Sequence, residues 1–189
     1  ARVTVVAALA LLVAVPWLVP SKYLVWASLT GIAAIGAVGL NLLSGSAGLI
    51  SLGHGAFLAT GAYAAANLAS RLDPPFWTGL PPAGLVAAAL GLIVGLPSMR
   101  VKGIYLAVAT IAAQFMTEWA INHVTWISGG AQATVTLPPP SLGPFVLDTE
   151  AERYLLILAV AVVAVVVALN INRSRLGRAF VAVRDRDLA

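Results

Sequence analysis

The sequence YLLILAVAVVAVVVALN, residues 154–170, decides the fold class of this chain. It carries no charged side chain and consists mainly of Leu, Val, Ile and Ala. At a rise of about 1.5 Å per residue, a helix of this length spans about 25 Å, close to the hydrocarbon core of a bilayer, which is about 30 Å thick. The stretch therefore predicts an α-helix that crosses a membrane.

Five more apolar stretches of similar length precede this one, separated by breaks rich in Pro, Gly and Ser. The first is not followed by a small-residue cleavage site, so we expect a retained span rather than a signal peptide. The sequence predicts an all-α, polytopic transmembrane helical bundle of about six spans. The expected spans are Val3–Val19, Tyr23–Leu43, Leu49–Leu68, Leu80–Leu96, Ile104–Ile121 and Tyr154–Asn170.

The composition is typical of a membrane protein and excludes an ordinary soluble domain. Hydrophobic residues make up 60% of the 189 residues, charged residues only 10%, and the mean hydropathy is +0.96. Soluble domains carry about 25% charged residues because they need a polar surface. The net charge of +4 does not indicate nucleic-acid binding, because five of the eleven basic residues follow the last apolar stretch as a membrane flank. The absence of cysteine excludes disulfides and thiolate metal sites, and no metal site is predicted.

Lys and Arg in the loops predict the orientation of the spans. Arg2, the pair Arg100 and Lys102, and the arginines after residue 170 all fall on the same side of a six-span chain. Because cytoplasmic loops carry the excess of Lys and Arg, both ends are expected in the cytoplasm. The segment 122–153 is then an external loop, which we expect to be irregular but ordered against the helices. A mere linker is the alternative.

The break between the second and third spans is the first candidate site. It reads GLNLLSGSAGLISLGHGAFLATGAYAAA at residues 39–66. Its glycines permit either close packing of helices or an interrupted helix whose free backbone groups line a solute path, and both interpretations stay open. In the second case the translocation pathway would include Asn41, Ser51, His54 and Gln114. Glu118, the one acidic residue inside a span, lies one turn after Gln114 and is expected near the membrane interface.

The segment 173–189 is the second candidate site. Leu176, Phe180 and Val183 are spaced to form one apolar stripe on a helix, with the arginines largely off that stripe. Such an amphipathic helix is expected either on an anionic lipid surface or in the groove of a soluble cytoplasmic partner. The chain has no GxxxxGK[ST] sequence, so it has no P-loop to bind ATP and is not expected to be an enzyme.

Three segments together resemble one known family, the branched-chain amino acid ABC transporter permeases of the LivM type. Residues 41–66, NLLSGSAGLISLGHGAFLATGAYAAA, are similar to the family's Asn-Leu, Gly-Ser-rich break, Ser-Leu-Gly-His and Gly-Ala-Tyr. PSMRVKGIYLAVAT at 97–110 resembles its basic turn followed by Gly-Ile-Tyr-Leu-Ala, and SRLGRAFVAVRDRDLA at 174–189 resembles the start of its coupling loop. Gly129 and Gly130 match a family Gly-Gly, whereas Ala133 stands where the family often has glycine.

The resemblance implies a permease subunit of an ATP-binding cassette importer for branched-chain or related amino acids, in the bacterial plasma (inner) membrane. The implied partners are a second permease subunit, two ATP-binding cassette ATPase subunits and an extracytoplasmic solute-binding protein. ATP is used by the partner subunits, and no cofactor is expected in this chain. The tail then becomes a cytoplasmic coupling segment, in which a glycine would allow close approach to an ATPase. The implied coupling residues are Leu176, Gly177, Arg178, Phe180 and Arg184.

Family members continue beyond this tail through further membrane helices. The resemblance therefore predicts that residues 1–189 are a single transmembrane permease domain, from the N-terminal part of a longer chain truncated within the coupling loop. Two other functions stay open at this point. One is an ATP-independent secondary transporter or channel, and the other is a membrane scaffold that transports nothing.

Overall fold

The computed structural model describes residues 2–72, 75–98, 101, 103–128, 140–142, 145–175 and 177–180. Six long helices coincide with the six predicted spans: α1 (Arg2–Leu18), α2 (Ser21–Leu40), α3 (His54–Leu72), α4 (Phe76–Ser98), α5 (Ile104–His123) and α7 (Glu150–Arg173). The shorter elements are a π-helical turn, η1 (Asn41–Ser46), the helix α6 (Thr125–Ser128), and two strands, β1 (Ser141–Leu142) and β2 (Phe145–Val146). The predicted all-α fold is confirmed.

Four of these helices are long and apolar enough to cross a membrane: α2 together with η1, α4, α5 and α7. In α1 the apolar stretch Val6–Leu18 is shorter. The helix α3 is long, but Asn67, Ser70 and Arg71 make its last turns polar. Polar side chains are tolerated in a membrane bundle where they bond to neighbouring segments, so α3 is compatible with the predicted span.

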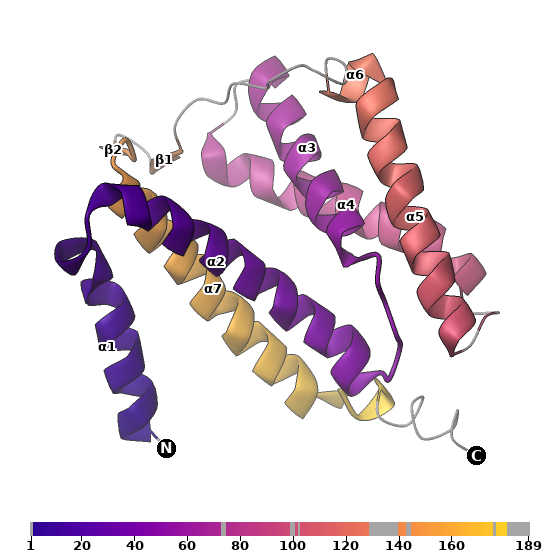
Figure 1. Cartoon of the computed structure of the whole chain (residues 1–189), viewed down its shortest axis with the longest axis horizontal. Coiled ribbons are helices and arrows are strands. Elements are labelled where there is room, and N and C mark those ends of the chain that lie inside the picture. The colour runs from indigo at the N-terminus through magenta and orange to yellow at the C-terminus, as the bar shows by residue number, and fades with distance from the viewer. Residues whose placement is uncertain are drawn as a thin grey trace. The chain divides into compact units, whose positions relative to one another are not determined.

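The helices α1, α2 and α7 belong to one compact unit, formed by residues 1–42 and 147–189. In this unit α7 lies along α2 (Figure 1). A Cβ atom added at Gly31 of α2 would come within 2.8 Å of the Ile157 side chain of α7. The glycine therefore allows the two helices to approach closely, as small residues do in membrane bundles.

A single hydrogen bond repairs a defect that proline introduces into α1. Pro16 has no N–H, so the carbonyl of Leu12, four residues earlier, lacks its ordinary helical donor. The hydroxyl of Tyr154 in α7 donates to this carbonyl at 3.1 Å. Tyr154 is only 6% exposed. The proline in one helix and the tyrosine in the other thus form a matched pair within this unit.

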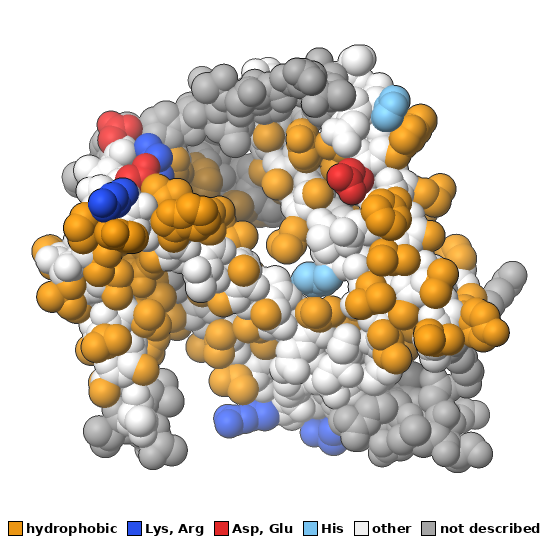
Figure 2. Space-filling model, viewed as in Figure 1, with side chains coloured by type: hydrophobic (Ala, Val, Ile, Leu, Met, Phe, Trp, Pro, Cys, Tyr) orange, Lys and Arg blue, Asp and Glu red, His pale blue; other side chains and the backbone are white. Residues whose placement is uncertain are grey.

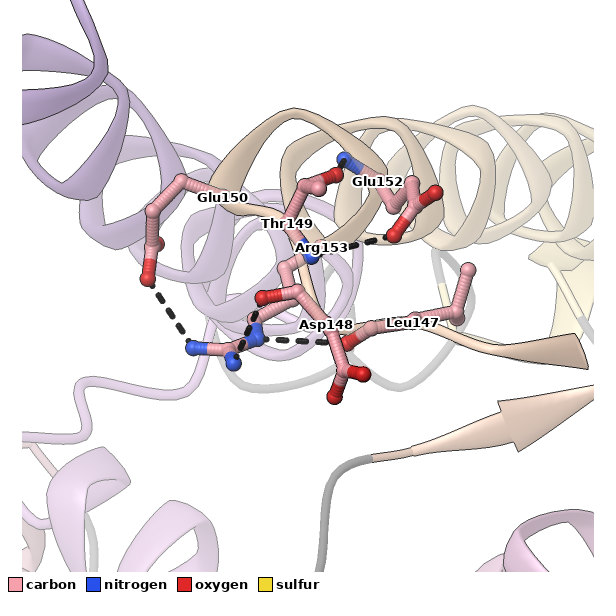
Figure 3. A network of polar contacts seen from close by, with 6 residues as sticks. All are labelled: Leu147, Asp148, Thr149, Glu150, Glu152 and Arg153. Atoms are coloured by element: carbon pink, nitrogen blue, oxygen red, sulfur yellow. Dashed lines mark hydrogen bonds and ion pairs between the residues drawn. The ribbon is translucent and has the colours of Figure 1, made fainter.

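A capping box starts α7 at Glu150, four residues earlier than predicted from its apolar stretch (Figure 3). The Thr149 hydroxyl accepts from the Glu152 N–H at 3.3 Å, and the Glu152 carboxylate accepts from the Thr149 N–H at 3.0 Å. Arg153 donates to the backbone carbonyls just before the helix and forms an ion pair with Glu150 at 2.9 Å. These polar contacts satisfy groups at the helix start, so the helix extends beyond its apolar part.

The helices α3, α4, α5 and α6 belong to the second unit, residues 43–146, in which α3 packs against both α4 and α5 (Figure 1). Glycines line the contact between α3 and α4: an added Cβ would lie 3.8 Å from Ala87 at Gly61 and 3.7 Å from Phe57 at Gly91. Close packing therefore explains part of the glycine-rich sequence. Small side chains occupy most buried positions of this unit, among them Ala56, Ala66, Ala83 and Ala107.

The segment 122–153 contains regular structure where it is described, so the expectation of an irregular loop is wrong at α6 and at the strands. Asn67 of α3 donates to the Ile127 carbonyl at 2.5 Å, which holds α6 against a helix, as expected. The strands β1 and β2 pair antiparallel. Gly129, Gly130 and Ala133 lie outside the described residues, and the external position of the segment stays a prediction.

The surface of both units is hydrophobic (Figure 2). Large apolar side chains are exposed on every long helix, including Leu11, Trp26, Leu58, Leu85, Met116 and Val163. A soluble protein does not expose apolar side chains so densely, whereas in a bilayer these side chains face lipid. The surface therefore supports the membrane location predicted from composition.

Candidate functional site

The predicted break between the second and third spans is present. The helix α2 ends at Leu40 and continues as the π-helical turn η1, and α3 begins only at His54. The predicted start of the third span at Leu49 is therefore wrong. Gly48 has a φ of 71°, in the left-handed region that favours glycine, and this turns the chain out of the helical path. Isolated π-helical turns occur frequently at functional sites.

The break is fastened to α5 through Thr110. The Leu52 N–H donates to the Thr110 hydroxyl at 3.0 Å, and this hydroxyl donates in turn to the Ala107 carbonyl at 2.9 Å. Gly53 is buried directly against α5, because a Cβ added there would lie 2.1 Å from the Thr110 carbonyl oxygen. No side chain fits in that space. The close contact explains why glycine occupies this position.

One turn further along α5, Gln114 lies over the first turn of α3. A Cβ added at Gly55 would come 3.3 Å from the Gln114 Oε1 atom. His54 is half-buried beside this glycine, with its ring 6.1 Å from that of Phe57. Ser51 is 7% exposed, and its hydroxyl has no hydrogen-bond partner among the described residues. We call residues 51–55 together with Thr110 and Gln114 the break–α5 junction.

Three of the four predicted pathway residues, Ser51, His54 and Gln114, lie at the break–α5 junction. The fourth, Asn41, is exposed on η1 and belongs to the other unit. Sequence reasoning missed Thr110, although it stands four residues before Gln114 and so falls on the same helix face. Glu118, one turn beyond Gln114, is exposed. The role of these residues in a pathway stays a prediction.

The junction combines non-helical backbone with polar side chains inside an otherwise apolar unit. In a bilayer such backbone is tolerated only where protein surrounds it or where it lines a water-filled cavity. Thr110 satisfies one backbone group of the break, whereas the Ser51 hydroxyl has no hydrogen-bond partner among the described residues. The arrangement is therefore suited to contact a polar solute within the membrane.

The tail after α7 is helical as far as it is described. Ser174 has extended backbone and ends α7, and the Arg178 N–H then donates to the Ser174 carbonyl at 3.4 Å. Gly177 is buried, and a Cβ there would lie 2.4 Å from the Asn172 carbonyl oxygen. The glycine thus makes a close approach to the end of α7 in its own chain, and its predicted contact with a partner stays a prediction.

The remaining predicted coupling residues differ in how far the structure describes them. Arg178 is exposed, and Phe180 is half-buried. Leu176 and Arg184 lie outside the described residues. The stripe of the predicted amphipathic helix is therefore seen only at Phe180, and the coupling role of the tail stays a prediction.

Comparison with known proteins gives a consistent result over almost the whole chain. The profile of a family described as "Branched-chain amino acid transport system / permease component" matches residues 20–189. The high-affinity branched-chain amino acid transport system permease protein LivM of Escherichia coli (strain K12) is 33% identical over 211 residues. The protein of the same name from Salmonella typhimurium (strain LT2) has the same identity over the same length. Each match covers 100% of this chain but 50% of the relative, so the chain spans half the length of these relatives. No solved structure matches.

Proposed function

The chain belongs to the family of permease components of branched-chain amino acid transport systems, and from this membership we propose that it forms part of the translocation pathway of an ATP-binding cassette importer. The observation that carries the proposal is the family match over residues 20–189, which includes both the break and the tail. The names of the two relatives support branched-chain amino acids as the substrate class. The origin of both relatives supports a multi-pass location in a bacterial inner membrane.

Within this proposal the break–α5 junction contributes to the pathway. Ser51, His54 and Gln114 would contact the polar end of an amino acid, and the non-helical backbone between Ala47 and Gly53 offers further hydrogen-bonding groups. Asn41 precedes this segment on η1. Alternating access would move the helices that flank the break, and Thr110 would keep the break attached to α5 during the movement.

The partners follow from the same proposal. A second permease subunit would complete the pathway, two ATPase subunits would bind and hydrolyse ATP, and an extracytoplasmic binding protein would deliver the substrate. The tail would contact an ATPase through the exposed Arg178 and the stripe that includes Phe180, while Gly177 holds the start of the tail against α7. Leu176 and Arg184 would belong to the same surface.

Uptake and copurification test the function. The tagged full-length protein is expected to copurify with ATPase subunits, and leucine uptake by membrane vesicles is expected to stop when ATP is depleted while the ion gradients are kept. Uptake that survives ATP depletion would instead identify a secondary transporter or channel. A full complex that binds its ATPases but takes up no amino acid would identify a scaffold.

Charge reversal at the tail tests the coupling role. Arg178→Glu is expected to lower substrate-stimulated ATP hydrolysis about tenfold, as truncation of an arginine anchor at an interface does. Lys22→Glu is the matched control, since Lys22 is also an exposed basic residue but lies at the start of α2, on the side predicted to be external. Replacement of Gly177 is a poorer test, because a side chain there collides with α7 itself. Equal activity of Arg178→Glu and Lys22→Glu would contradict coupling through this tail.

A further inference from the structure

A large apolar groove lies within the second unit, lined by residues of α3, α4 and α5 and, at one end, of α6. These four helices are labelled in Figure 1. Its volume is about 1100 Å³, and its walls are formed almost entirely by hydrocarbon, for example from Leu68, Ile93 and Met116. Ser51, His54 and Gln114 do not line it. The groove is therefore separate from the break–α5 junction, and the proposed function gives it no role.

The groove has the length of one membrane leaflet and is open along its side. On α3 its lining runs from Thr60 to Leu72, which is about 18 Å at 1.5 Å per residue. One leaflet is half of a hydrocarbon core of about 30 Å, or about 15 Å. Ile93 on the α4 wall and Met116 on the α5 wall are 69% and 72% exposed. Among the described residues this side of the groove is therefore open to a lipid chain.

The α6 end of the groove is cationic and aromatic. Arg71 Nη2 donates to the Trp126 carbonyl at 2.5 Å, and the Arg71 Cζ atom lies 4.3 Å from the centre of the Trp126 ring. The bond from Asn67 to the Ile127 carbonyl fixes the same turn. Arginine has five N–H donors in a planar fork, so the bond to Trp126 leaves several that can reach a phosphate group at the groove mouth. Tryptophan and arginine near the end of a membrane helix are typical of the headgroup level.

We propose that this groove binds an acyl chain of an anionic phospholipid, whose phosphate is bound by Arg71 beside Trp126. The apolar walls account for the hydrocarbon chain, and the arginine accounts for the negative headgroup. A protein helix in the same groove would bury its apolar side chains equally well but would not require a cation at the mouth. Charge complementarity therefore favours the lipid over a helix.

Fluorescence quenching of Trp126 tests the proposal. The full-length protein is prepared with Trp126 retained and every other tryptophan replaced by phenylalanine, and is placed in nanodiscs with brominated phosphatidylglycerol or brominated phosphatidylcholine. Phosphatidylglycerol is expected to half-quench Trp126 at a mole fraction about fivefold lower than phosphatidylcholine, the preference that one basic residue near a membrane surface provides. Equal quenching by the two lipids would overturn the specific headgroup site, and no quenching by either would show that a protein segment covers the groove.

Three variants separate the parts of the site. Arg71→Gln is expected to abolish the preference for phosphatidylglycerol, whereas Arg71→Lys keeps the charge and is expected to retain most of it. Ala113→Phe places a larger side chain on the α5 wall and so narrows the groove, while Arg71 is unchanged. This variant is expected to lower the number of phosphatidylglycerol molecules that remain bound in native mass spectrometry. Lys22→Gln, an exposed basic residue of the other unit, serves as the control. If Arg71→Gln and Lys22→Gln reduce the lipid preference equally, general surface charge explains it and the site does not exist.

Discussion

The helix α7 and the segment between α2 and α3 both provide hydrogen-bond partners for backbone groups in apolar surroundings, but by different means. In α7 the N–H and C=O groups pair within one uninterrupted helix, and a local capping box closes its start. Between Leu40 and His54 the chain leaves the α-helical pattern, and the Leu52 N–H depends on Thr110, 58 residues away in sequence. A regular helix is therefore robust to single changes, whereas the break depends on a few contacts with α5.

A side chain added at Gly53 should cause the largest loss of stability, because it would disrupt the contact with α5 on which the break depends. Gly53→Ala places a Cβ atom 2.1 Å from the Thr110 carbonyl oxygen, which belongs to the backbone of α5 and cannot rotate away. We expect a loss of about 3 kcal/mol in the free energy of unfolding, at the upper end of overpacking costs. Denaturant unfolding of the full-length protein in detergent micelles measures this loss.

Gly84→Ala is the matched control for Gly53→Ala. Gly84 lies inside α4, and nothing stands within 4 Å of a Cβ atom added there. Alanine in a helix interior is more stable than glycine by about 0.5–1 kcal/mol, so this variant should gain stability. If the two variants unfold alike, the contact between the break and α5 is not a requirement of the fold.

Removal of the Thr110 hydroxyl should have the next largest effect. Thr110→Val keeps the shape of the side chain but leaves the Leu52 N–H without its acceptor. The expected cost is about 2 kcal/mol, within the range for an unsatisfied backbone group. Hydrogen exchange of the Leu52 amide should become faster in the same variant, which locates the effect at the break.

Thr117→Val serves as the control for Thr110→Val. Among the described residues the Thr117 hydroxyl bonds only back to the Ala113 carbonyl in its own helix, so its loss should change stability by less than about 0.5 kcal/mol. Thr110→Ser keeps the acceptor and should behave nearly as wild type. Slow exchange of Leu52 in Thr110→Val would mean that another group holds this amide.

A double-mutant cycle in the first unit should show a smaller and local effect. Tyr154→Phe removes the donor to the Leu12 carbonyl, at an expected cost of about 0.6–1 kcal/mol, typical of a hydrogen bond between membrane helices. Pro16→Ala restores a helical N–H to the same carbonyl, so Tyr154→Phe should cost almost nothing in that background. An equal cost in both backgrounds would show that the tyrosine does not compensate for the proline.

The fold was predictable from sequence because a membrane helix must be apolar over its whole length. That requirement placed all six long helices, including α7. The ends were less predictable, since they depend on polar contacts that hydropathy does not register. Because of the capping box of Thr149, α7 begins at Glu150, before its predicted start. The positive φ of Gly48 contributes to the late start of α3 at His54.

The candidate site was predictable only in part, for a similar reason. Polar residues inside apolar stretches are conspicuous in a sequence, and this signal found Ser51, His54 and Gln114. Thr110 was missed because its importance comes from Leu52, and nothing in the sequence near either residue indicates the other. Gly177 makes a close contact with the Asn172 carbonyl in the same chain, which the sequence did not indicate, and its role toward a partner stays a prediction.

Ser51 should have the smallest effect on stability, and for that reason it is the best test of function at the break. It is 7% exposed, and its hydroxyl has no partner among the described residues. A buried hydroxyl without a partner costs free energy, so Ser51→Ala should leave the free energy of unfolding unchanged or raise it by up to about 1 kcal/mol.

Ser28→Ala in α2 is a close control, because Ser28 is 9% exposed and its hydroxyl also lacks a partner among the described residues. If the hydroxyl of Ser51 contacts the substrate, leucine uptake falls in Ser51→Ala and not in Ser28→Ala, while both proteins keep their stability. Uptake that is equal in the two variants would exclude Ser51 from the pathway. The break would then have a structural role only, maintained by the contacts of Thr110 and Gly53.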